Sequence, residues 1–493
     1  MSQAVIHAGI ETYGAYIPIT RLPLSVINGK APKEGDAEKA VAWSDEDCIT
    51  MAVSAAMNCL KGRDTTAIDV VMLATTTLAF SEKQGASIVA KALDLTGDVK
   101  TVDVSGSLRA GTLALQQAID TVKAGSARKV LVIASDCRMG APKSGIEASV
   151  GDAAVAFLVS SDKVIAELSA SASCANEMMD VWRRQGDQFV HTWEDRFIND
   201  HGLIEISAAA IKTLYKKTGK SAKDFTKACL YATDARNLGS IMKTAGLKPE
   251  QMQDAMFGKV GCAGAAFAPL LLAAALENGK AGDSVLVSSY GDGADALVFV
   301  QKDEVKDKAT RRGVQFHVQR RRTVDNYNKY LSARDLTVTE YPPADDQGIS
   351  ATVQYRNRDE NLSLQGHICG NCGTHQFPKG RVCVRCGSKD DWANYTYANN
   401  STGRALTYTF DAFYPSPEPP TVATIIEVVL ADGRPGPRIH MQFADATAKD
   451  MKTGLPVEFV FRRIHRAGRR PNYFWKCTPI QTSAVAVKTG GAV

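Results

Sequence analysis

"GDAAVAFLVSSDK" (residues 151–163) and "GDGADALVFVQKD" (residues 291–303) follow one pattern. Each begins with Gly-Asp, continues as an apolar run and ends in polar residues, which predicts a buried strand after a tight turn. Each also follows a helical pattern, a glycine turn and another apolar run, in "AIDTVKAGSARKVLVIAS" (118–135) and "ALENGKAGDSVLVSSY" (275–290). The repeat predicts an α/β core of two similar halves packed as a pseudo-dimer. The alternative is an ordinary α/β protein in which apolar strands simply follow glycine turns.

The alternation of strand-like and helical patterns extends outward over residues 1–303. "DVVMLATTT" (69–77) and "ACLYATDA" (228–235) occupy corresponding places in the two halves as predicted strands, and "DCITMAVSAAMNCL" (47–60) predicts a helix. Beyond residue 390, short alternating runs separated by Gly, Pro and Asp predict a small all-β barrel. We expect halves at 1–163 and 164–303, a basic linker at 304–345, a helix and metal ribbon at 346–392, the barrel at 393–485 and a tail at 486–493.

Composition excludes several classes of protein. The chain has 493 residues, 45% of them hydrophobic and 23% charged, which is typical of a globular protein with more than one domain. A formal charge of +5 is too small to indicate nucleic-acid binding. We find neither a secretory signal nor an apolar run of about 18 residues that predicts a membrane span. Eleven cysteines, an odd number, fit a reducing, cytoplasmic environment better than a disulfide framework.

A four-cysteine motif is the most specific signal in the chain. In "CGNCGTHQFPKGRVCVRCG", Cys369-x-x-Cys372 precedes Cys383-x-x-Cys386. Two such knuckles place four thiolates around one point, which is the ligand set of a structural zinc site. Four sulfur ligands leave no open coordination position, so no catalytic role is expected. Iron is the next metal by ligand preference, and a redox dithiol or a chance spacing would explain the motif without a metal.

Two resemblances to known families rest on particular segments. "YGAYIP" (13–18), "DEDCITMAVSAA" (45–56), "AGTLALQQA" (110–118), "RKVLVIASD" (128–136), "SVGDAAVAFLV" (149–159) and "SYGDGADA" (289–296) resemble hydroxymethylglutaryl-CoA synthase and its relatives in the thiolase superfamily. "HICGNCGTHQFPKGRVCVRCGS" (367–388), "LPVEFVFRR" (455–463) and "NYFWKC" (472–477) resemble the zinc-ribbon/OB-fold family of acyl-CoA enzymes, domain of unknown function 35. Together they imply a layered αβαβα core followed by a zinc ribbon and an OB-fold barrel.

The synthase resemblance implies a Cys nucleophile, a Glu acid/base and a His that holds the second substrate. In "SGSLRAGT" (105–112) the Cys position carries Leu108, with Ser107 beside it. Thr76 stands at the Glu position and Tyr231 at the His position, so all three depart from the family. Cys262, in "VGCAGAA", lies near the place of a ligand-contacting Asn in that family.

Several routes could replace the missing chemistry. Leucine cannot be acylated, and Ser107 would need a nearby base. The pKa of Cys262 could be lowered by backbone N–H groups at a helix start, although Cys262 and the similar Cys137 could simply be packing residues. Tyr231, assisted by Asp234 or Asp292, could serve as acid/base; the alternatives are a buried tyrosine and aspartates that brace their turns. By resemblance to thiolase-fold aldolases, backbone N–H groups at Gly111 or Gly264 would then hold a thioester enolate without an acyl-enzyme.

Basic residues of the linker offer a ligand contact. Arg311, Arg320 and Arg321 lie in its arginine-rich part, which is either a solvated face or a cationic edge for the phosphates of coenzyme A.

We therefore expect a protein that handles acyl-CoA and forms or cleaves a C–C bond next to the thioester, as an acyltransferase or C–C lyase without the usual Cys-Glu-His set. The alternative is a non-catalytic scaffold that positions acyl-CoA for a separate thiolase, so whether the chain is an enzyme stays open. By resemblance, its partner is a second copy or a thiolase-type subunit. Neither nucleic acid nor membrane is expected as a partner.

Overall fold

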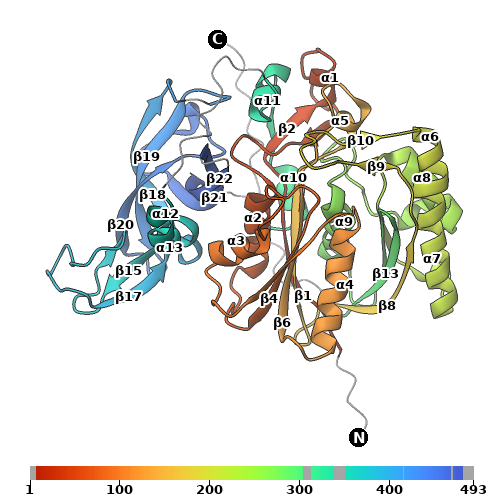
Figure 1. The fold of residues 1–493 in the computed structure, drawn as a ribbon, viewed down its shortest axis with the longest axis horizontal. Coiled ribbons are helices and arrows are strands. Elements are labelled where there is room, and N and C mark those ends of the chain that lie inside the picture. The colour runs from red at the N-terminus through yellow and green to blue at the C-terminus, as the bar shows by residue number, and fades with distance from the viewer. Residues whose placement is uncertain (1–6, 304–311, 338–349, 415, 468–469, 481–493) are drawn as a thin grey trace, which may run out of the picture.

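The structure is a computed structural model that describes residues 7–303, 312–337, 350–414, 416–467 and 470–480. Its largest sheet has nine strands in the order β11-β12-β13-β8-β1-β7-β6-β4-β5 (Figure 1). The strands are β1 (Gly9–Tyr16), β4 (Ile68–Ala74), β5 (Lys100–Val104), β6 (Lys129–Asp136), β7 (Ala153–Ser160), β8 (Ala166–Ala175), β11 (Lys227–Leu230), β12 (Ser284–Tyr290) and β13 (Gly293–Gln301). The glycine-led runs that close the two sequence repeats are β7 and β13, as predicted.

The nine strands divide into two halves of related topology. The first half lies in the order β5-β4-β6-β7-β1, and the second half repeats this order as β11-β12-β13-β8 without an equivalent of β5. A parallel bridge between Ala228 and Met252 adjoins β11 in place of that strand. Within this sheet the halves are joined by a short antiparallel pairing of β1 with β8, at Gly9–Glu167 and Ile10–Ala166. The predicted duplication of an α/β core is therefore confirmed.

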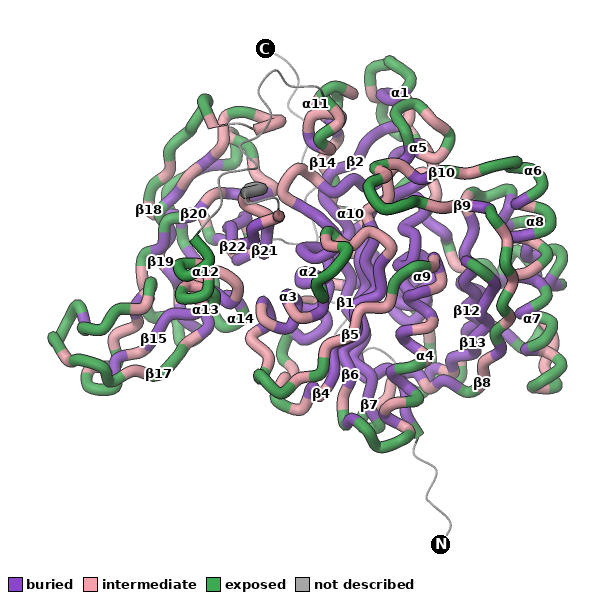
Figure 2. The backbone as a smooth tube through the Cα atoms, in the orientation of Figure 1, coloured by how far each residue is buried: buried purple, intermediate pink, exposed green. Residues whose placement is uncertain are grey.

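Helices complete a five-layered arrangement. Two helices, α4 and α9, contact each other between the two halves of the sheet, whereas α2 covers the outer face of the first half and α7 that of the second. Figure 2 shows the burial of the central strands. In α9 every residue from Phe267 to Glu277 is buried, because a helix enclosed on all sides has no polar face. The bounds are α2 (Cys48–Leu60), α4 (Ala110–Lys123), α7 (Glu205–Thr218), α8 (Ala235–Ala245) and α9 (Phe267–Asn278).

Short elements fill the connections of the core. Strands β2, β3 and β14 form one small sheet, and β9 and β10 form another. Their bounds, with those of the accompanying helices, are α1 (Leu24–Ile27), β2 (Thr20–Pro23), β3 (Glu38–Ala40), α3 (Gly85–Ala92), α5 (Gly145–Ser149), β9 (Val181–Trp182), β10 (His191–Thr192), α6 (Asp195–Phe197), α10 (Val314–Gln319), β14 (Arg322–Thr323) and α11 (Tyr327–Ala333).

The C-terminal part is a cysteine ribbon followed by a curled antiparallel sheet. Five strands lie in the order β20-β19-β18-β21-β22, and a bridge from Phe443 to Cys477 brings the two edges of the sheet together. Burial alternates along β19, as a one-sided strand requires. The predicted all-β C-terminal domain is confirmed, while its assignment as an OB-fold stays a prediction. The elements are α12 (Ala351–Arg356), α13 (Arg358–Ser363), β15 (Gln365–Cys369), β16 (His375–Gln376), β17 (Trp392–Thr396), α14 (Tyr397–Asn400), β18 (Ser401–Asp411), β19 (Thr421–Leu430), β20 (Pro435–Gln442), β21 (Pro456–Ala467) and β22 (Arg470–Pro479).

The arginine-rich linker packs on the core where the structure describes it. Arg321 pairs with Glu38 at 3.1 Å, and Arg312 makes two 2.8 Å hydrogen bonds to Glu458 of the barrel. Burial lowers the pKa of Arg320, and Arg311 lies outside the described residues. These contacts join the linker to its neighbours, and a role of Arg320 and Arg321 in holding CoA phosphates stays a prediction.

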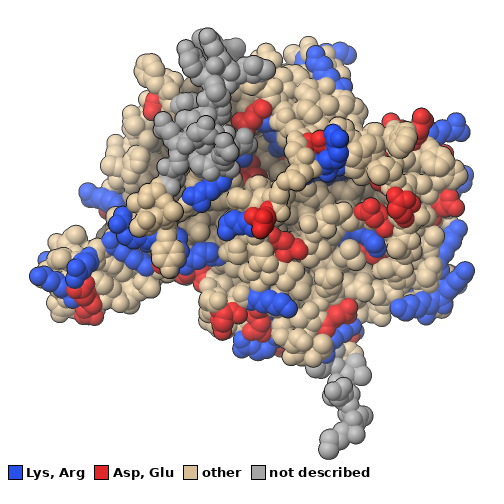
Figure 3. Space-filling view, in the orientation of Figure 1, with Lys and Arg blue, Asp and Glu red and all other residues tan. Residues whose placement is uncertain are grey.

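Charged side chains of both signs are interspersed over the core in Figure 3, and Lys and Arg gather over the C-terminal part at the left. Among the described helices, none combines the length and the apolar character needed to cross a membrane.

A buried polar cluster joins the first half of the core to the barrel. The guanidinium of Arg462, from β21, is fully buried and lies 3.0 Å from Asp445 and 3.4 Å from Glu46. The phenol of Tyr16, from β1, donates to Glu46 and accepts from Arg462 at 3.0 Å. Burial raises the pKa of Glu46 to about 7, although Arg462 opposes that shift. Because a buried charge needs its partners, these contacts hold the barrel in one position on the core.

Replacing Glu46 with glutamine should remove a pH dependence of stability. A carboxyl with a pKa of 4.5 in the unfolded chain and about 7 in the folded one lowers stability as pH rises between these values, by at most about 1.4 kcal/mol per pH unit. Denaturation midpoints at pH 5, 6, 7 and 8 measure the stability of both proteins. The stability of Glu46→Gln relative to the wild type should increase up to about pH 7 and then stay constant. Glu34→Gln, at an exposed site, is the control. A stability difference between Glu46→Gln and the wild type that does not change with pH would contradict the assignment.

Candidate functional site

A buried aspartate organises the strand ends where the two halves meet. Asp136, at the end of β6, is fully buried and accepts hydrogen bonds from the hydroxyls of Thr75, Thr76 and Thr77 and from the backbone N–H of Thr76, all at 2.7–3.0 Å. A fifth bond, of 2.8 Å, comes from the backbone N–H of Ala265, just before α9. The carboxylate thus joins the first half to the start of a helix in the second. Thr76, which the sequence analysis aligns with the Glu acid/base, is held by this network.

Tyr231 and Cys262 meet in the second half. Tyr231 follows β11, Cys262 precedes α9, and their side chains share a hydrogen bond. Burial raises the pKa of both groups, most strongly that of Tyr231. The sequence argument required a lowered pKa for Cys262 and a lowered pKa or an assisting carboxylate for Tyr231. Both shifts run the other way, because desolvation exceeds the help from backbone N–H groups. Both groups are therefore neutral at pH 7 and suited to donate hydrogen bonds.

Leu108, which the sequence analysis aligns with the nucleophile, is a buried apolar side chain. Leu108 is 7% exposed and belongs to the hydrophobic core. The hydroxyl of Ser107 donates to the carbonyl of Gly291 at 2.8 Å. A methyl group at Gly291, where φ is +157°, would lie 2.7 Å from Ser107 Oγ. The β12–β13 turn therefore packs directly against the start of α4.

Asp292 lies in this turn with its side chain exposed and its backbone in the left-handed region, φ +50°. Arg109 donates to the carbonyl of Asp292 at 3.3 Å and pairs with Asp295 at 3.0 Å. Asp292 is the one carboxylic acid among the four candidate catalytic residues. Because its side chain is exposed, a ligand in solution can contact it.

The other residues considered in the sequence have structural contacts. Asp234 caps α8 by accepting from the N–H of Asn237 at 2.9 Å. Cys137 contacts the hydroxyl of Thr77 at 3.6 Å, and burial raises its pKa to about 12. A methyl group at Gly111 would lie 2.3 Å from the carbonyl of Ala265, so this glycine permits close packing of α4 against the start of α9. The N–H of Gly264 is already bonded to Cys262.

Residues 176–204 cover the strand ends from the outside. Arg183 donates to the carbonyl of Thr76, and Val190 N–H donates to the carbonyl of Met139 at 2.9 Å. Asp180 accepts from the phenol of Tyr290 at 2.7 Å. The sequence analysis assigned no role to this segment or to Asp136. The run of three threonines together with the Asp that ends a predicted neighbouring strand was the signal that could have found the Asp136 network.

The four ribbon cysteines form a compact cluster away from these strand ends. Their sulfur atoms all lie within 4.8 Å of one another, with Cys369–Cys386 at 3.7 Å and Cys372–Cys383 at 3.6 Å. A tetrahedral ion with metal–sulfur bonds of about 2.3 Å needs sulfur atoms about 3.8 Å apart, so the cluster fits one metal ion. The predicted association of these residues is confirmed. His367 stacks on Trp392 at 3.9 Å instead of joining the cluster.

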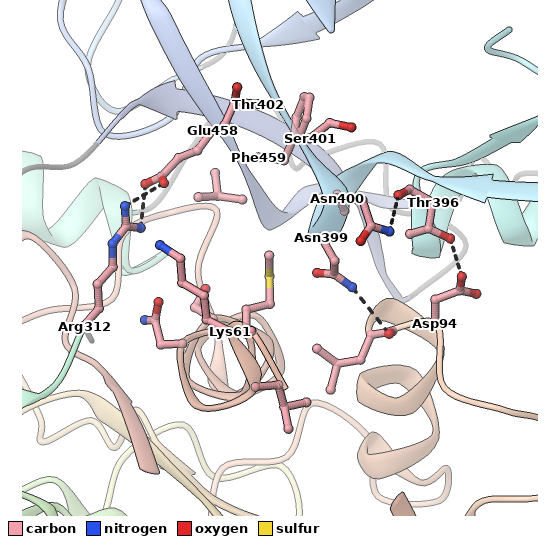
Figure 4. A pocket seen from close by; sticks show the side chains of 18 of the residues that line it. Lys61, Asp94, Arg312, Thr396, Asn399, Asn400, Ser401, Thr402, Glu458 and Phe459 are labelled. Carbon is pink, nitrogen blue, oxygen red and sulfur yellow. Dashed lines mark hydrogen bonds and ion pairs between the residues drawn. The ribbon is translucent and has the colours of Figure 1, made fainter. Parts of the chain in front are cut away.

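A polar cleft of about 750 Å³ lies between α2 and the C-terminal domain (Figure 4). Its walls include Lys61 just after α2, Arg312 and Glu458 on one side and Asn399 and Asn400 on the other. The start of α2 contacts Thr77 through Cys48, whereas the cleft adjoins the other end of that helix. Tyr231, Cys262, Ser107 and Asp292 are not among the residues that line this cleft.

Known proteins agree with this architecture. No family model matches the chain. The hydroxymethylglutaryl-CoA synthase of Methanocaldococcus jannaschii is 29% identical over 334 residues, 64% of this chain and 96% of that protein; that of Pyrococcus furiosus is 30% identical over 339 residues, 66% and 95%. An HMG-CoA synthase complexed with CoA superposes with a TM-score of 0.61 at 22% identity, covering 69% of this chain and 93% of that one. MvaS in complex with 3-hydroxy-3-methylglutaryl coenzyme A gives a TM-score of 0.59 at 18% identity, covering 69% and 95%.

These structural matches show the fold of the core, and the two relatives show its ancestry. Each relative is covered over nearly its whole length, so the similarity takes in both halves of the duplicated core and not the strand-end motifs alone. Over these aligned residues, the chain belongs to the hydroxymethylglutaryl-CoA synthase family.

Proposed function

We propose that this chain binds a CoA thioester at the meeting point of the two halves and forms or cleaves a C–C bond next to it without an acyl-enzyme. The observation that carries the proposal is the buried Leu108 at the family's nucleophile position. A leucine there removes the covalent route, yet the family core and the turn that presents this residue are intact. Two of the family relatives are solved with CoA or with an acyl-CoA, which supports the ligand class.

An aldolase-type step suits the groups that remain. In the cleaving direction, a base removes the hydroxyl proton of a 3-hydroxyacyl-CoA, the C2–C3 bond breaks, and a carbonyl compound leaves a thioester enolate that is reprotonated at C2. Asp292 supplies an exposed carboxylate as the candidate base. Tyr231 and Cys262, neutral because burial raises the pKa of each, supply hydrogen-bond donors. Ser107 is less suited to nucleophilic attack, because its hydroxyl is engaged by Gly291.

Intact-mass spectrometry tests the absence of an acyl-enzyme. After incubation with acetyl-CoA or butyryl-CoA, the wild type should keep its mass while retaining bound CoA thioester in equilibrium dialysis. Leu108→Cys should gain one acyl group, since it restores a thiol at the start of α4, and Leu108→Ala is the matched control without a nucleophile. A stable acyl adduct on the wild type, mapped to Cys262, Cys137 or Ser107, would contradict the proposed absence of an acyl-enzyme.

A second candidate function is a non-catalytic subunit that presents acyl-CoA to a separate thiolase. The observation that favours it is the neutral, buried Tyr231–Cys262 pair, which offers no base of its own. In that case the chain alone binds CoA thioesters but releases no acetyl-CoA from 3-hydroxyacyl- or 3-oxoacyl-CoA, and turnover requires the partner. By the resemblance stated above, the partner is a second copy of this chain or a thiolase-type subunit, and the second candidate function requires the latter.

The C-terminal part supports the same ligand class. We propose that it is a zinc-ribbon/OB-fold domain of the type that accompanies acyl-CoA enzymes, and that Cys369, Cys372, Cys383 and Cys386 hold Zn²⁺. The ion would cross-link the two knuckles of the ribbon and stabilise its fold.

Metal analysis tests this assignment. The purified protein should contain one zinc per chain, and Cys383→Ser should lose it together with several degrees of thermal stability. Cys477→Ser is the control, a buried cysteine outside the cluster. Iron in place of zinc, or a full complement of metal in Cys383→Ser, would contradict the proposal.

A further inference from the structure

Arg334 is a buried cation that joins the linker to the first half of the core. It is the C-terminal capping residue of α11, and its side chain is only 9% exposed. Its guanidinium donates to the carboxylate of Asp152 at 2.7 Å and to the carbonyls of Ala42 and Cys137 at 3.1 and 3.2 Å. Neither the sequence patterns nor the proposed chemistry gives this arginine a role.

The ion pair between Arg334 and Asp152 is closed off from water. Asp152 is 2% exposed, and the same carboxylate oxygen accepts from the backbone N–H of Ala42 at 2.7 Å. A buried charge is unfavourable unless its partners compensate it. Without the guanidinium, this carboxylate would keep, among the described residues, only the N–H of Ala42 as a donor. We therefore expect the turn that ends at Asp152 to lose its fixed conformation when Arg334 is replaced.

That turn is bonded directly to the segment that carries Cys262. Gly151 N–H donates to the carbonyl of Cys262 at 3.0 Å, and Cys262 N–H donates to the carbonyl of Ser149 at 2.8 Å. A methyl group at Gly151 would lie 1.8 Å from the carbonyl oxygen of Val260, so the two segments pack backbone against backbone. A movement of the turn at Asp152 would therefore move Cys262.

The bond to the Cys137 carbonyl brings the same guanidinium to the end of β6. Cys137 directly follows Asp136, and its N–H donates to the hydroxyl of Thr77 at 3.1 Å. One side chain thus contacts the segment next to Asp136 and, through Asp152, reaches the turn of the second half that carries Cys262.

We infer that Arg334 is a positioning residue of the candidate site, which holds Cys262 and its hydrogen-bonded partner Tyr231 in place relative to the end of β6. The inference rests on the proposed binding of a CoA thioester between the halves and names the group that keeps the two sides of that site aligned. Arg334 acts through Asp152 and Gly151. A planar guanidinium suits this role, because it reaches a carboxylate and two carbonyls at once in a fixed geometry.

Backbone hydrogen exchange and butyryl-CoA binding by the full-length chain test this role. In Arg334→Gln, amide exchange should rise about tenfold at residues 149–152 and 260–263 and stay at the wild-type rate in α7, because the lost ion pair is local. The dissociation constant for butyryl-CoA, from isothermal titration, should also rise about tenfold. Arg334→Lys should recover part of both losses, since it keeps the charge opposite Asp152 without the planar fork. If Arg334→Gln does not fold, Asp152→Asn should show the same two changes.

Arg312→Gln is the matched control, because Arg312 belongs to the same linker and also pairs with a partly buried carboxylate, that of Glu458 at 2.8 Å. It should leave exchange at 149–152 and 260–263 and the butyryl-CoA affinity at their wild-type values. Thermal unfolding of each variant checks that its fold is intact.

Three results for Arg334→Gln would overturn the inference: unchanged exchange in the two segments, exchange that rises equally over the whole chain, or an unchanged butyryl-CoA affinity. Failure of the wild type to bind butyryl-CoA would overturn the proposed function instead. The exchange measurement separates the two cases, because it needs no ligand.

Discussion

The Asp136 carboxylate is the contact on which the arrangement of the site depends. It gathers three threonine hydroxyls at the end of β4 and the N–H of Ala265 at the start of α9, and so connects the two halves of a duplicated core. Thr76, Arg138 and Cys262 lie in segments that this carboxylate joins, and Tyr231 contacts Cys262. Buried carboxylates are tolerated when their lone pairs are satisfied, and five donors satisfy this one.

A second polar cluster joins the C-terminal domain to the core. Arg462 of the barrel, surrounded by Glu46, Asp445 and Tyr16, fixes the barrel against the outer face of the first half. The barrel therefore adjoins α2, at whose start Tyr473 donates to Asp47 at 2.8 Å, and the polar cleft of Figure 4 lies between the two domains. In this chain the catalytic candidates and the metal ribbon are separate parts of one molecule.

Much of the fold could be predicted from the sequence because it rests on local patterns. The glycine-led apolar runs became β7 and β13, and the CxxC spacing brought four sulfur atoms together. The site was less predictable, because its properties come from contacts between distant segments. The charge states of Tyr231 and Cys262 follow from burial, which no local pattern reveals. The sequence pattern indicates only that Asp136 is the polar end of a strand. Its role in joining the two halves follows from the folded structure, in which the threonines and Ala265 surround it.

Hydrogen exchange of the full chain with and without butyryl-CoA tests the central claim most directly, because it reports where a CoA thioester binds without assuming any chemistry. Binding between the halves predicts ligand-dependent protection of residues 75–77, 136–139 and 261–267, with smaller changes over the covering segment 176–204. Protection confined to the cleft walls at residues 396–402, or no protection at saturating ligand, would contradict the account.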